Sequence, residues 1–497
     1  MKSSVLSKSR FLGGLQCGKR LWYEVNRREE VPPPNAAKLA IFAQGHAVGA
    51  VAQSLYPDGL EVAPDERGWQ AVAAATREAL SARRPLFEAG FVHGGGACRV
   101  DILVPAPDGG WDLFEVKSTA SVKPEHDLDL AFQTWVVRGA GLALRDLYLV
   151  HVDSSYVLDG ALDPQGLLRR ERRNERVEAL LPEIEPRLSE LLETAALAAS
   201  PEVAIGPHCS SPHDCPLIPL CWAFLPERNV TTLHGDRRRG FELLARGISR
   251  LADIPEDFRL NGKQRLQVEA ARNGEAVVDA CKIRDFLAAL EPPLHYLDFE
   301  TVNPAIPVYQ GTRPFQPVPF QFSLHRQARI GGDVDAIAFL AEGHEDPRPA
   351  LLARLEEALL DRGTILAYNA DFERRVLREL AAAFPEEGAW IGAAESRIVD
   401  LLVPFRQFAW YHPDQDGSAS MKAVLPAMTG VGYEELAIAD GNQASREFLR
   451  VTFGDVPAAE RARVRRDLER YCALDTLGMA HIVEELATAA RHRIIVL

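Results

Sequence analysis

Apolar and polar residues alternate with a period of two at several places in the chain, which is typical of half-buried strands. The segments CRVDILVPA at 98–106 and WDLFEVKS at 111–118 alternate in this way, and the Pro-Asp-Gly-Gly turn between them predicts a hairpin. A helix is expected to follow at 128–141 and a further strand at 146–152. Apolar residues spaced three or four apart over 174–199 predict a long helix.

A second series of elements begins at EPPLHYLDFETV, where two prolines precede an apolar strand. This strand is expected to follow the prolines and to run to residue 302, with further strands at 320–328, 334–342 and 364–369 and helices at 349–361, 370–384 and 461–491. Between the two series, turn-forming clusters such as PERN and IPED predict a connector at 226–289. The chain is therefore expected to form two mixed α/β (α+β) domains, at 1–225 and 290–497.

Composition narrows the class of protein without naming a function. The 497 residues are 47% hydrophobic and 25% charged, which is ordinary for a soluble globular protein. Neither a membrane-spanning apolar run nor a secretory leader is apparent, so we expect a cytoplasmic protein with no membrane partner. The net charge of −14 argues against a passive nucleic-acid coat, but it allows an enzyme that holds metal ions in carboxylate clusters.

Three of the seven cysteines stand at equal steps in HCSSPHDCPLIPLCW. These are Cys209, Cys215 and Cys221, and clustered thiols in the reducing cytoplasm favour metal binding over disulfides. Three thiolates leave a four-coordinate site one ligand short. The remaining isolated cysteines have apolar neighbours and are expected to be buried packing residues: Cys98, Cys281 and Cys472.

The hairpin carries the first group of candidate catalytic residues. Glu115 and Lys117 share one face of their strand, and Asp101 on the paired strand can lie beside them. A divalent cation bound by the carboxylates would compensate this charge, and Lys117 would stabilise a phosphate in the transition state. Gln133 on the following helix is placed to orient substrate or water. An ordinary charged surface strand is the alternative on this pattern alone.

With the cysteines included, this segment resembles the PD-(D/E)XK nucleases of the RecB-like branch, in particular CRISPR-associated members that carry an iron–sulfur cluster. The resemblance implies a restriction-endonuclease-like fold for 1–225, with Mg²⁺ or Mn²⁺ bound by Asp101 and Glu115. Val100 stands where the family name has proline. Glu88 corresponds to an accessory carboxylate of this branch, with a surface glutamate as the alternative.

The same resemblance implies a fourth cysteine ligand in the N-terminal segment FLGGLQCGKRLWYE, where Cys17 is the candidate. Four thiolates suit a [4Fe–4S] cluster, which would have a structural role. Structural zinc is the alternative, although zinc ligands are usually paired at shorter spacing. His46 lies near a position where the family can have a histidine, in imperfect register.

The second group of candidate catalytic residues is acidic. Asp298 and Glu300 are two positions apart in the strand YLDFET, and Glu373 follows a strand in AYNADFERRVL. Tyr471 and Asp475 are four apart in ERYCALDT, which puts them on one face of a helix. Four acids from separate elements can hold two Mg²⁺ or Mn²⁺ ions for phosphodiester hydrolysis, and the tyrosine can contact the attacking water.

This ordered set resembles the DEDD exonucleases of the DnaQ-like, ribonuclease H-related superfamily, in the subgroup with tyrosine in the last motif. The resemblance covers about 290–490 and implies a ribonuclease H-like fold with 3′–5′ exonuclease activity. The family usually has aspartate where Glu373 stands, and Asp371 is the other candidate ligand. Asp400 is a candidate supporting acid, with an ordinary aspartate at a helix or strand end as the alternative. In GSASMKAVLP, Ser418, Ser420 and Lys422 stand where a loop meets a helix and are candidates for contact with phosphate through hydroxyl and helix N–H groups, with an ordinary N-cap as the alternative.

The sequence therefore predicts a metal-dependent nuclease with two active sites, acting on nucleic acid, with DNA favoured. The order of the two segments also resembles an uncharacterised bacterial family that joins these two nuclease types. An RNA-processing exonuclease and a nucleic-acid-binding scaffold with one degenerate site are the alternatives. A regulatory iron–sulfur sensor is a third, and the sequence points to no particular protein partner.

Overall fold

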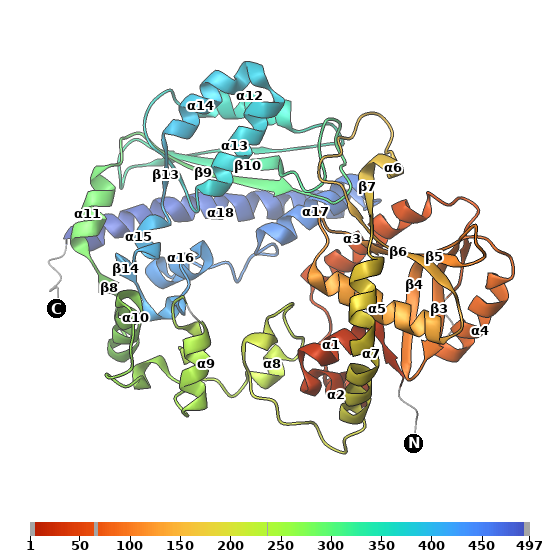
Figure 1. Cartoon of the computed structure of the whole chain (residues 1–497). Helices are drawn as coiled ribbons and strands as arrows, with labels where there is room; N and C mark the ends of the chain where they lie inside the picture. The colour runs from red at the N-terminus through yellow and green to blue at the C-terminus, as the bar shows by residue number, and fades with distance from the viewer. Residues whose placement is uncertain (1–4, 64–67, 236, 492–497) are drawn as a thin grey trace. The chain divides into compact units, whose positions relative to one another are not determined.

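The computed structural model describes residues 5–63, 68–235 and 237–491. Two compact units divide the chain (Figure 1). The first comprises Met1–Ala223 and Pro304–Gln316, and the second Phe224–Asn303 and Pro317–Leu497. Both are mixed α/β, as expected. Within the described ranges, every helix is too short or too polar to span a bilayer.

A seven-stranded mixed sheet forms the centre of the first unit. Its strand order is β2-β3-β4-β5-β6-β7, and β1 pairs with β4 outside this path. The predicted hairpin is the antiparallel pair β4–β5, whereas β6 runs parallel to β5. The strands are β1 (Leu6–Ser7), β2 (Leu60–Glu61), β3 (Leu86–His93), β4 (Gly96–Pro105), β5 (Trp111–Lys117), β6 (Leu144–Val152) and β7 (Leu168–Arg172).

Helix α5 lies between this sheet and α7, and its apolar residues join both to one core. Phe132 of α5 stacks on Phe11 of α1, with ring centroids 4.5 Å apart. Helix α5 begins four residues before the predicted start, because Pro124 fits the first turn. The helices are α1 (Lys8–Gln16), α2 (Gly18–Asn26), η1 (Arg28–Glu30), α3 (Ala36–Gln53), α4 (Trp69–Leu80), α5 (Pro124–Gly139), α6 (Pro164–Leu167), α7 (Asn174–Ala195), η2 (Pro207–Cys209) and α8 (Ile218–Cys221).

The segment Pro304–Gln316 belongs to the first unit although it follows the first strand of the second unit's sheet. Leu158 N donates to Thr312 O at 3.0 Å. Gly160 and the side chain of Gln310 exchange two hydrogen bonds, of 2.7 and 3.0 Å. Apolar residues of this segment also pack in a core cluster with α3 and the sheet.

The second unit has a five-stranded sheet of order β11-β10-β9-β12-β13. The pairs β11–β10 and β10–β9 are antiparallel, and β9–β12 and β12–β13 are parallel. A small separate pair joins β8 to β14. The strands are β8 (Val277–Val278), β9 (Leu294–Val302), β10 (Val318–Gln327), β11 (Val334–Leu340), β12 (Ile365–Ala367), β13 (Ile398–Asp400) and β14 (Trp410–Tyr411).

Side chains of β9 alternate between the two faces of this sheet. Leu297 and Phe299 pack in a core with α12, α13 and α14, whereas α18 lies along the other face (Figure 1). Asp298 and Glu300 point to the α18 face. The helices are η3 (Val230–Thr232), α9 (Arg237–Ala245), η4 (Leu251–Asp253), α10 (Gly262–Asn273), α11 (Ala280–Ala288), α12 (Arg348–Ala358), α13 (Asp371–Ala383), η5 (Pro385–Glu387), α14 (Gly388–Ser396), α15 (Val403–Arg406), η6 (Pro413–Gln415), α16 (Met421–Thr429), α17 (Gly441–Phe453) and α18 (Ala458–Arg491).

Two features differ from the simplest interpretation of the sequence. The stretch expected as a connector, 226–289, contains α9, α10 and α11 and a small apolar core of its own. The prediction that Cys281 is buried is wrong. It is exposed on α11, where only Ile283 is fully buried, because this short helix presents a single side to the protein interior. Cys98 and Cys472 are buried.

Candidate functional site

The first carboxylate cluster forms where strands β4 and β5 separate. Their pairing ends at Ile102 opposite Phe114. One residue further along, the Asp101 carboxylate accepts a hydrogen bond of 2.7 Å from the backbone N–H of Val116. The Asp101 carboxylate therefore accepts the hydrogen bond that a backbone carbonyl of a paired strand would otherwise accept. This bond holds Asp101 next to β5, the strand that carries Glu115.

Glu115 is buried, with 1% of its surface exposed, and its carboxylate contacts three polar side chains. Lys8 and Lys117 each lie 2.7 Å from its Oε1, and Gln133 donates to its Oε2 at 2.7 Å. Asp129 completes the group, 2.5 Å from Lys117, 3.1 Å from Gln133 and 3.4 Å from Lys8. The side-chain oxygen of Gln133, Oε1, is buried without a hydrogen-bond partner.

Sequence reasoning missed two members of this cluster. Asp129 precedes Gln133 by one helical turn, so it lies on the same face of α5, and that spacing was a usable signal. Lys8 is 107 positions from Glu115, and nothing local in the sequence connects the two. Of the accessory candidates, Glu88 lies 4.0 Å from Arg99, and His46 is exposed on α3.

Burial and opposite charge act against each other in this cluster. Burial, together with the Glu115 charge, raises the pKa of Asp101 to about 8. Burial would also raise the pKa of Glu115, but the ammonium groups of Lys117 and Lys8 outweigh it, and the pKa falls below its usual range. Glu115 is therefore ionised at neutral pH, whereas Asp101 keeps a proton unless a further cation approaches.

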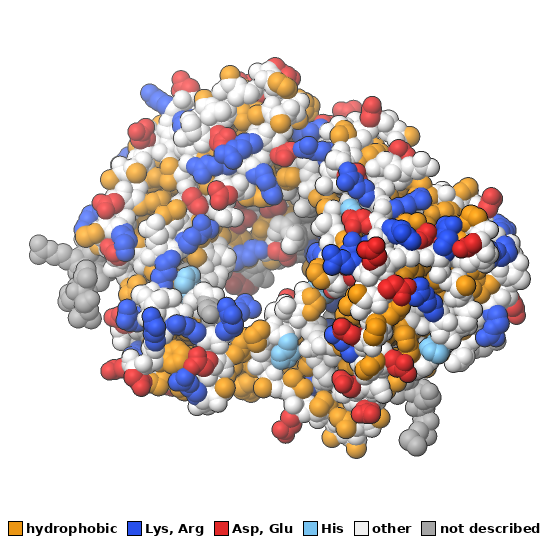
Figure 2. Space-filling view, in the orientation of Figure 1, with side chains coloured by type: hydrophobic (Ala, Val, Ile, Leu, Met, Phe, Trp, Pro, Cys, Tyr) orange, Lys and Arg blue, Asp and Glu red, His pale blue; other side chains and the backbone are white. Residues whose placement is uncertain are grey.

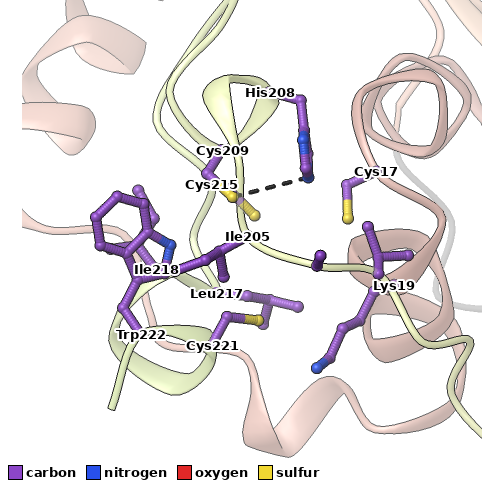
Figure 3. Close-up of a pocket in the computed structure, with 12 residues that line it drawn as sticks. Cys17, Lys19, Ile205, His208, Cys209, Cys215, Leu217, Ile218, Cys221 and Trp222 are labelled. Carbon is purple, nitrogen blue, oxygen red and sulfur yellow. Dashed lines mark hydrogen bonds between the residues drawn. The ribbon is translucent and has the colours of Figure 1, made fainter. Parts of the chain in front are cut away.

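Four cysteines line one pocket of the first unit, and Figure 3 shows their sulfur atoms around it. Cys17 is the junction residue between α1 and α2. The other three come from the loop after α7, which is folded on itself because Cys215 N donates to Cys209 O and Cys221 N donates to Leu217 O, both at 2.8 Å. All seven cysteines of the chain are free thiols.

The four thiol groups line the same pocket, but their sulfur atoms are more widely spaced than the ligands of a single zinc ion. Burial raises the pKa of Cys215 and of Cys221, and the nearby Lys19 ammonium partly offsets this for Cys221. His208 Nε2 lies 3.7 Å from the sulfur of Cys209. No three of the four sulfur atoms lie within 4.8 Å of one another, judged over the described residues. Tetrahedral zinc needs sulfur atoms about 3.8 Å apart, so the pocket is wider than one such ion requires.

The second cluster lies where α18 crosses β9. The carboxylates of Asp298, Glu300 and Asp475 offer oxygen atoms that are all within 4.8 Å of one another. Tyr471 precedes Asp475 by one turn of α18 and donates a hydrogen bond to it. The Cys472 thiol lies 3.5 Å from Asp298 Oδ2. Two elements far apart in the sequence thus bring three acids to one place.

Glu373 joins this neighbourhood from the first turn of α13. Only 2% of its surface is exposed, and its Oε2 is buried without a hydrogen-bond partner. Asp371, the other candidate in the segment, is exposed. Asp400 ends β13, where its Oδ1 accepts hydrogen bonds from the backbone N–H of Asn369 at 3.0 Å and of Leu402 at 2.9 Å. Asp400 therefore stabilises the loops around the cluster.

The pKa of each of the four acids of the second cluster is raised. Burial, followed by the charges of Asp475 and Glu300, raises the pKa of Asp298 well above its usual range. Burial, with the neighbouring acids, raises the pKa of Glu300 to about 8. Burial likewise raises the pKa of Glu373 to about 8 and that of Asp475 to about 6. Four ionised carboxylates at this place require a cation to balance them.

Tyr433 and Lys422 complete the surroundings of Asp475. The Tyr433 hydroxyl donates to Asp475 Oδ1, so this carboxylate accepts from two tyrosines. Lys422 Nζ lies 5.8 Å from the ring centre of Tyr433 and 5.7 Å from that of Tyr471. Burial raises the pKa of both tyrosines, which keeps their hydroxyl groups protonated. Sequence reasoning named Lys422 but not Tyr433, which stands alone in a loop.

Comparison with known proteins gives one matching family. Residues 295–420 match a family model described as a domain of unknown function (DUF2779). The matched stretch includes Asp298, Glu300 and Glu373 and ends before α18. An uncharacterized protein of Mycoplasma pneumoniae, the MG366 homolog, is 25% identical in a match of length 214 that covers 38% of this chain. The match covers 31% of that protein's length.

Proposed function

We propose that the chain is a metal-dependent nuclease that hydrolyses phosphodiester bonds of DNA at two separate sites. In the first unit, the site is of RecB-like PD-(D/E)XK type, in a restriction-endonuclease-like fold. In the second unit, it is of DnaQ-like DEDD type with tyrosine, in a ribonuclease H-like fold with 3′–5′ exonuclease activity. The two sites use different residues, so each can be removed without changing the other.

The observation that carries this proposal is the second carboxylate cluster. Three acids offer oxygen atoms within 4.8 Å of one another, with Glu300 buried and Asp298 and Asp475 half-buried. Together with the buried, unpartnered oxygen of Glu373 nearby, they form a set of oxygen donors with more negative charge than the single Lys422 can balance. Hard divalent cations such as Mg²⁺ and Mn²⁺ prefer oxygen donors of this kind. The donor set therefore fits the ions that phosphodiester hydrolysis needs.

In the second site, Asp298, Glu300, Glu373 and Asp475 would hold the ions. When bound, a pair of Mg²⁺ or Mn²⁺ ions supplies activation of water and neutralisation of the phosphate charge. Tyr471 remains protonated, so its role is to donate a hydrogen bond and orient Asp475 or water, not to abstract a proton. Lys422 adds positive charge beside the same carboxylates.

In the first site, Asp101 and Glu115 would hold the divalent ion. Gln133 fixes the orientation of the Glu115 carboxylate by donating to its Oε2 at 2.7 Å. Lys117, held by Glu115 and Asp129, presents a fixed positive charge for the phosphate in the transition state. Lysines and arginines are interspersed with acids over the visible surface (Figure 2), which favours local contacts to nucleic acid over a broad basic face.

For the cysteine pocket, we propose a [4Fe–4S] cluster held by Cys17, Cys209, Cys215 and Cys221. The sulfur spacing supports it, since a cluster of four irons separates its thiolates more widely than a single zinc ion does. The ligands come from the α1–α2 junction and from the loop after α7, so the cluster would join distant parts of the first unit. Iron, acid-labile sulfide and zinc analysis of the purified protein separates the two metals.

The decisive experiment is degradation of end-labelled single-stranded and double-stranded DNA and RNA with Mg²⁺ or Mn²⁺. Wild type is compared with Glu115→Ala, Asp298→Ala and the double variant. Each single variant is expected to lose a different product pattern by at least about 100-fold, and the double variant to be inert. Preferred cleavage of RNA would favour the RNA-processing alternative. Binding without cleavage by wild type would refute the nuclease and leave a scaffold.

A further inference from the structure

Lys8 enters the first site from an element that holds no other member of the cluster. It is the first residue of α1, directly after β1. On one side of it, Leu6 is fully buried and its backbone N–H donates to Gly95 O at 2.8 Å. On the other side, Phe11 stacks on Phe132 of α5. The backbone around Lys8 is therefore anchored, and only its side chain is free to change position.

Both carboxylate oxygens of Glu115 already accept hydrogen bonds from protein groups. Oε1 accepts from both Lys8 and Lys117, each at 2.7 Å, and Oε2 accepts from Gln133 at 2.7 Å. Each carboxylate oxygen has two lone pairs, so Oε1 is saturated whereas Oε2 keeps one free, and a divalent ion that binds Oε1 must displace one of the two lysines. Two ammonium groups on one carboxylate oxygen are one more than a single ion pair needs.

Lys8 is the donor that can leave at the least cost. Lys117 is two residues from Glu115 on the same strand and also lies 2.5 Å from Asp129, whereas Lys8 lies 3.4 Å from Asp129. The Lys8 side chain is also the more exposed of the two, at 25% against 19%. When it leaves Glu115, its long stem keeps the ammonium group close to the carboxylate cluster, where it can bind an anion.

We propose that Lys8 is a second phosphate-binding lysine of the first site, which occupies Glu115 until a divalent ion displaces it and then contacts the nucleic-acid backbone. This inference rests on the proposed nuclease function and adds to it a residue that no family motif supplied. The site would then bind metal and substrate in a coupled way, because the ion releases the cation that the phosphate needs.

The test uses the full chain with Asp298→Ala, so that Mn²⁺ and DNA are read at the first site. Variants Lys8→Met and Lys8→Arg are compared with Lys38→Met, a lysine of α3 outside the cluster. Mn²⁺ binding is followed by electron paramagnetic resonance, and DNA binding in Ca²⁺ by fluorescence anisotropy against salt concentration. Lys8→Met should bind Mn²⁺ about tenfold more tightly and lose about 0.7–0.9 from the salt slope, the value of one phosphate contact.

Lys8→Arg should keep the salt slope, and Lys38→Met should change neither quantity. Unchanged Mn²⁺ affinity together with an unchanged salt slope in Lys8→Met would overturn the inference and make Lys8 a structural ion pair. If Lys8→Met fails to fold, Lys8→Gln, which keeps a hydrogen-bond donor without the charge, is measured in its place. If wild type binds no nucleic acid, the proposed function fails, and the Mn²⁺ measurement alone decides whether Lys8 competes with the ion.

Discussion

The carboxylates of the second site make the stability of the folded protein depend on pH. Burial raises the pKa of Glu300 and of Glu373 to about 8 and of Asp475 to about 6. The folded protein thus binds more protons than the unfolded chain between about pH 4.5 and pH 8. Stability from these groups is present in full below the unfolded pKa and is lost as the pH rises through the folded pKa.

We therefore predict that the chelator-treated protein has a lower Tm at pH 8 than at pH 5, measured by differential scanning fluorimetry. Mn²⁺ should raise the Tm more at pH 8 than at pH 5, because the ion binds the ionised carboxylates. The variant Asp298→Asn should flatten both effects by removing one of the competing charges. A metal-induced rise that is equal at both pH values would contradict the metal-site interpretation.

Glu373 gives the sharpest prediction for one residue. Its buried, unpartnered Oε2 predicts that Glu373→Gln raises the Tm of the chelator-treated protein, since it removes a carboxylate that burial disfavours. The same substitution should weaken Mn²⁺ binding at the second site and lower exonuclease activity by at least about 100-fold. Asp371→Asn, two residues away and exposed, is the matched control and should change nothing. Equal effects of both substitutions would show that the helix, not the buried acid, matters.

Sequence patterns identified site residues that are paired at strand or helix spacing, and they missed residues that reach a site through tertiary contacts alone. The spacing of Asp298 from Glu300, and of Tyr471 from Asp475, follows from strand and helix periods and was visible in the sequence. Tyr433 and Lys8 were not visible, because they approach the sites through tertiary contacts from a loop and from the start of a helix. Burial distinguishes Glu373 from Asp371, and burial is a property of the folded protein.

At the scale of elements, helices and strands with strong hydrophobic periodicity were predicted correctly, and those with weak periodicity were not. The β4–β5 hairpin and the long helix α18 are confirmed, with the ends of α18 at Ala458 and Arg491. The helices between 226 and 289 were not recognised, because they are short and lie among turn-forming residues. Helices α9 and α10 share an apolar core that includes Val230, Leu243 and Val268, and no single helix reveals such a core by its pattern.

The junction of α1 and α2 gives a prediction for this scale. If a cluster joins Cys17 to the loop after α7, Cys17→Ser should lose iron and the associated visible absorbance, and the loop at 207–222 should become sensitive to chymotrypsin. A fall in the Tm of the first unit should accompany the loss. Cys281→Ser, an exposed cysteine of the second unit, is the matched control. If the wild-type protein contains zinc and no iron, the pocket is a zinc site and the [4Fe–4S] proposal is wrong.

At the scale of the whole molecule, the sequence predicts domains that are continuous stretches of chain, whereas the compact units of the structure are each built from two separate stretches. The boundaries expected at 225 and 290 assign each stretch of chain to one domain. The structure assigns Pro304–Gln316, which lies between strands β9 and β10, to the first unit. Periodicity and turn signals report on local structure, so they cannot reveal that a connecting segment packs in a core formed mainly by residues from another part of the sequence.

This assignment predicts that a fragment ending at residue 225 is not a complete folding unit. It would lack the fully buried Ala305 and the partly buried Ile306 and Phe315, which pack in the cluster with Val48 and Phe87. We expect the fragment to be less stable than one with segment 304–316 fused to its C-terminus through a Gly/Ser linker, by about 3 kcal/mol in urea unfolding.

A fusion that carries the same thirteen residues in shuffled order is the control, and it should behave as the bare fragment does. The backbone contacts at Leu158 and Gly160 explain why composition alone is insufficient: they require a particular chain path past these residues. Equal unfolding midpoints for all three fragments would mean that the first unit folds without the segment. In that case the segment only lies on a finished surface, and the boundary near 225 is the true end of the folding unit.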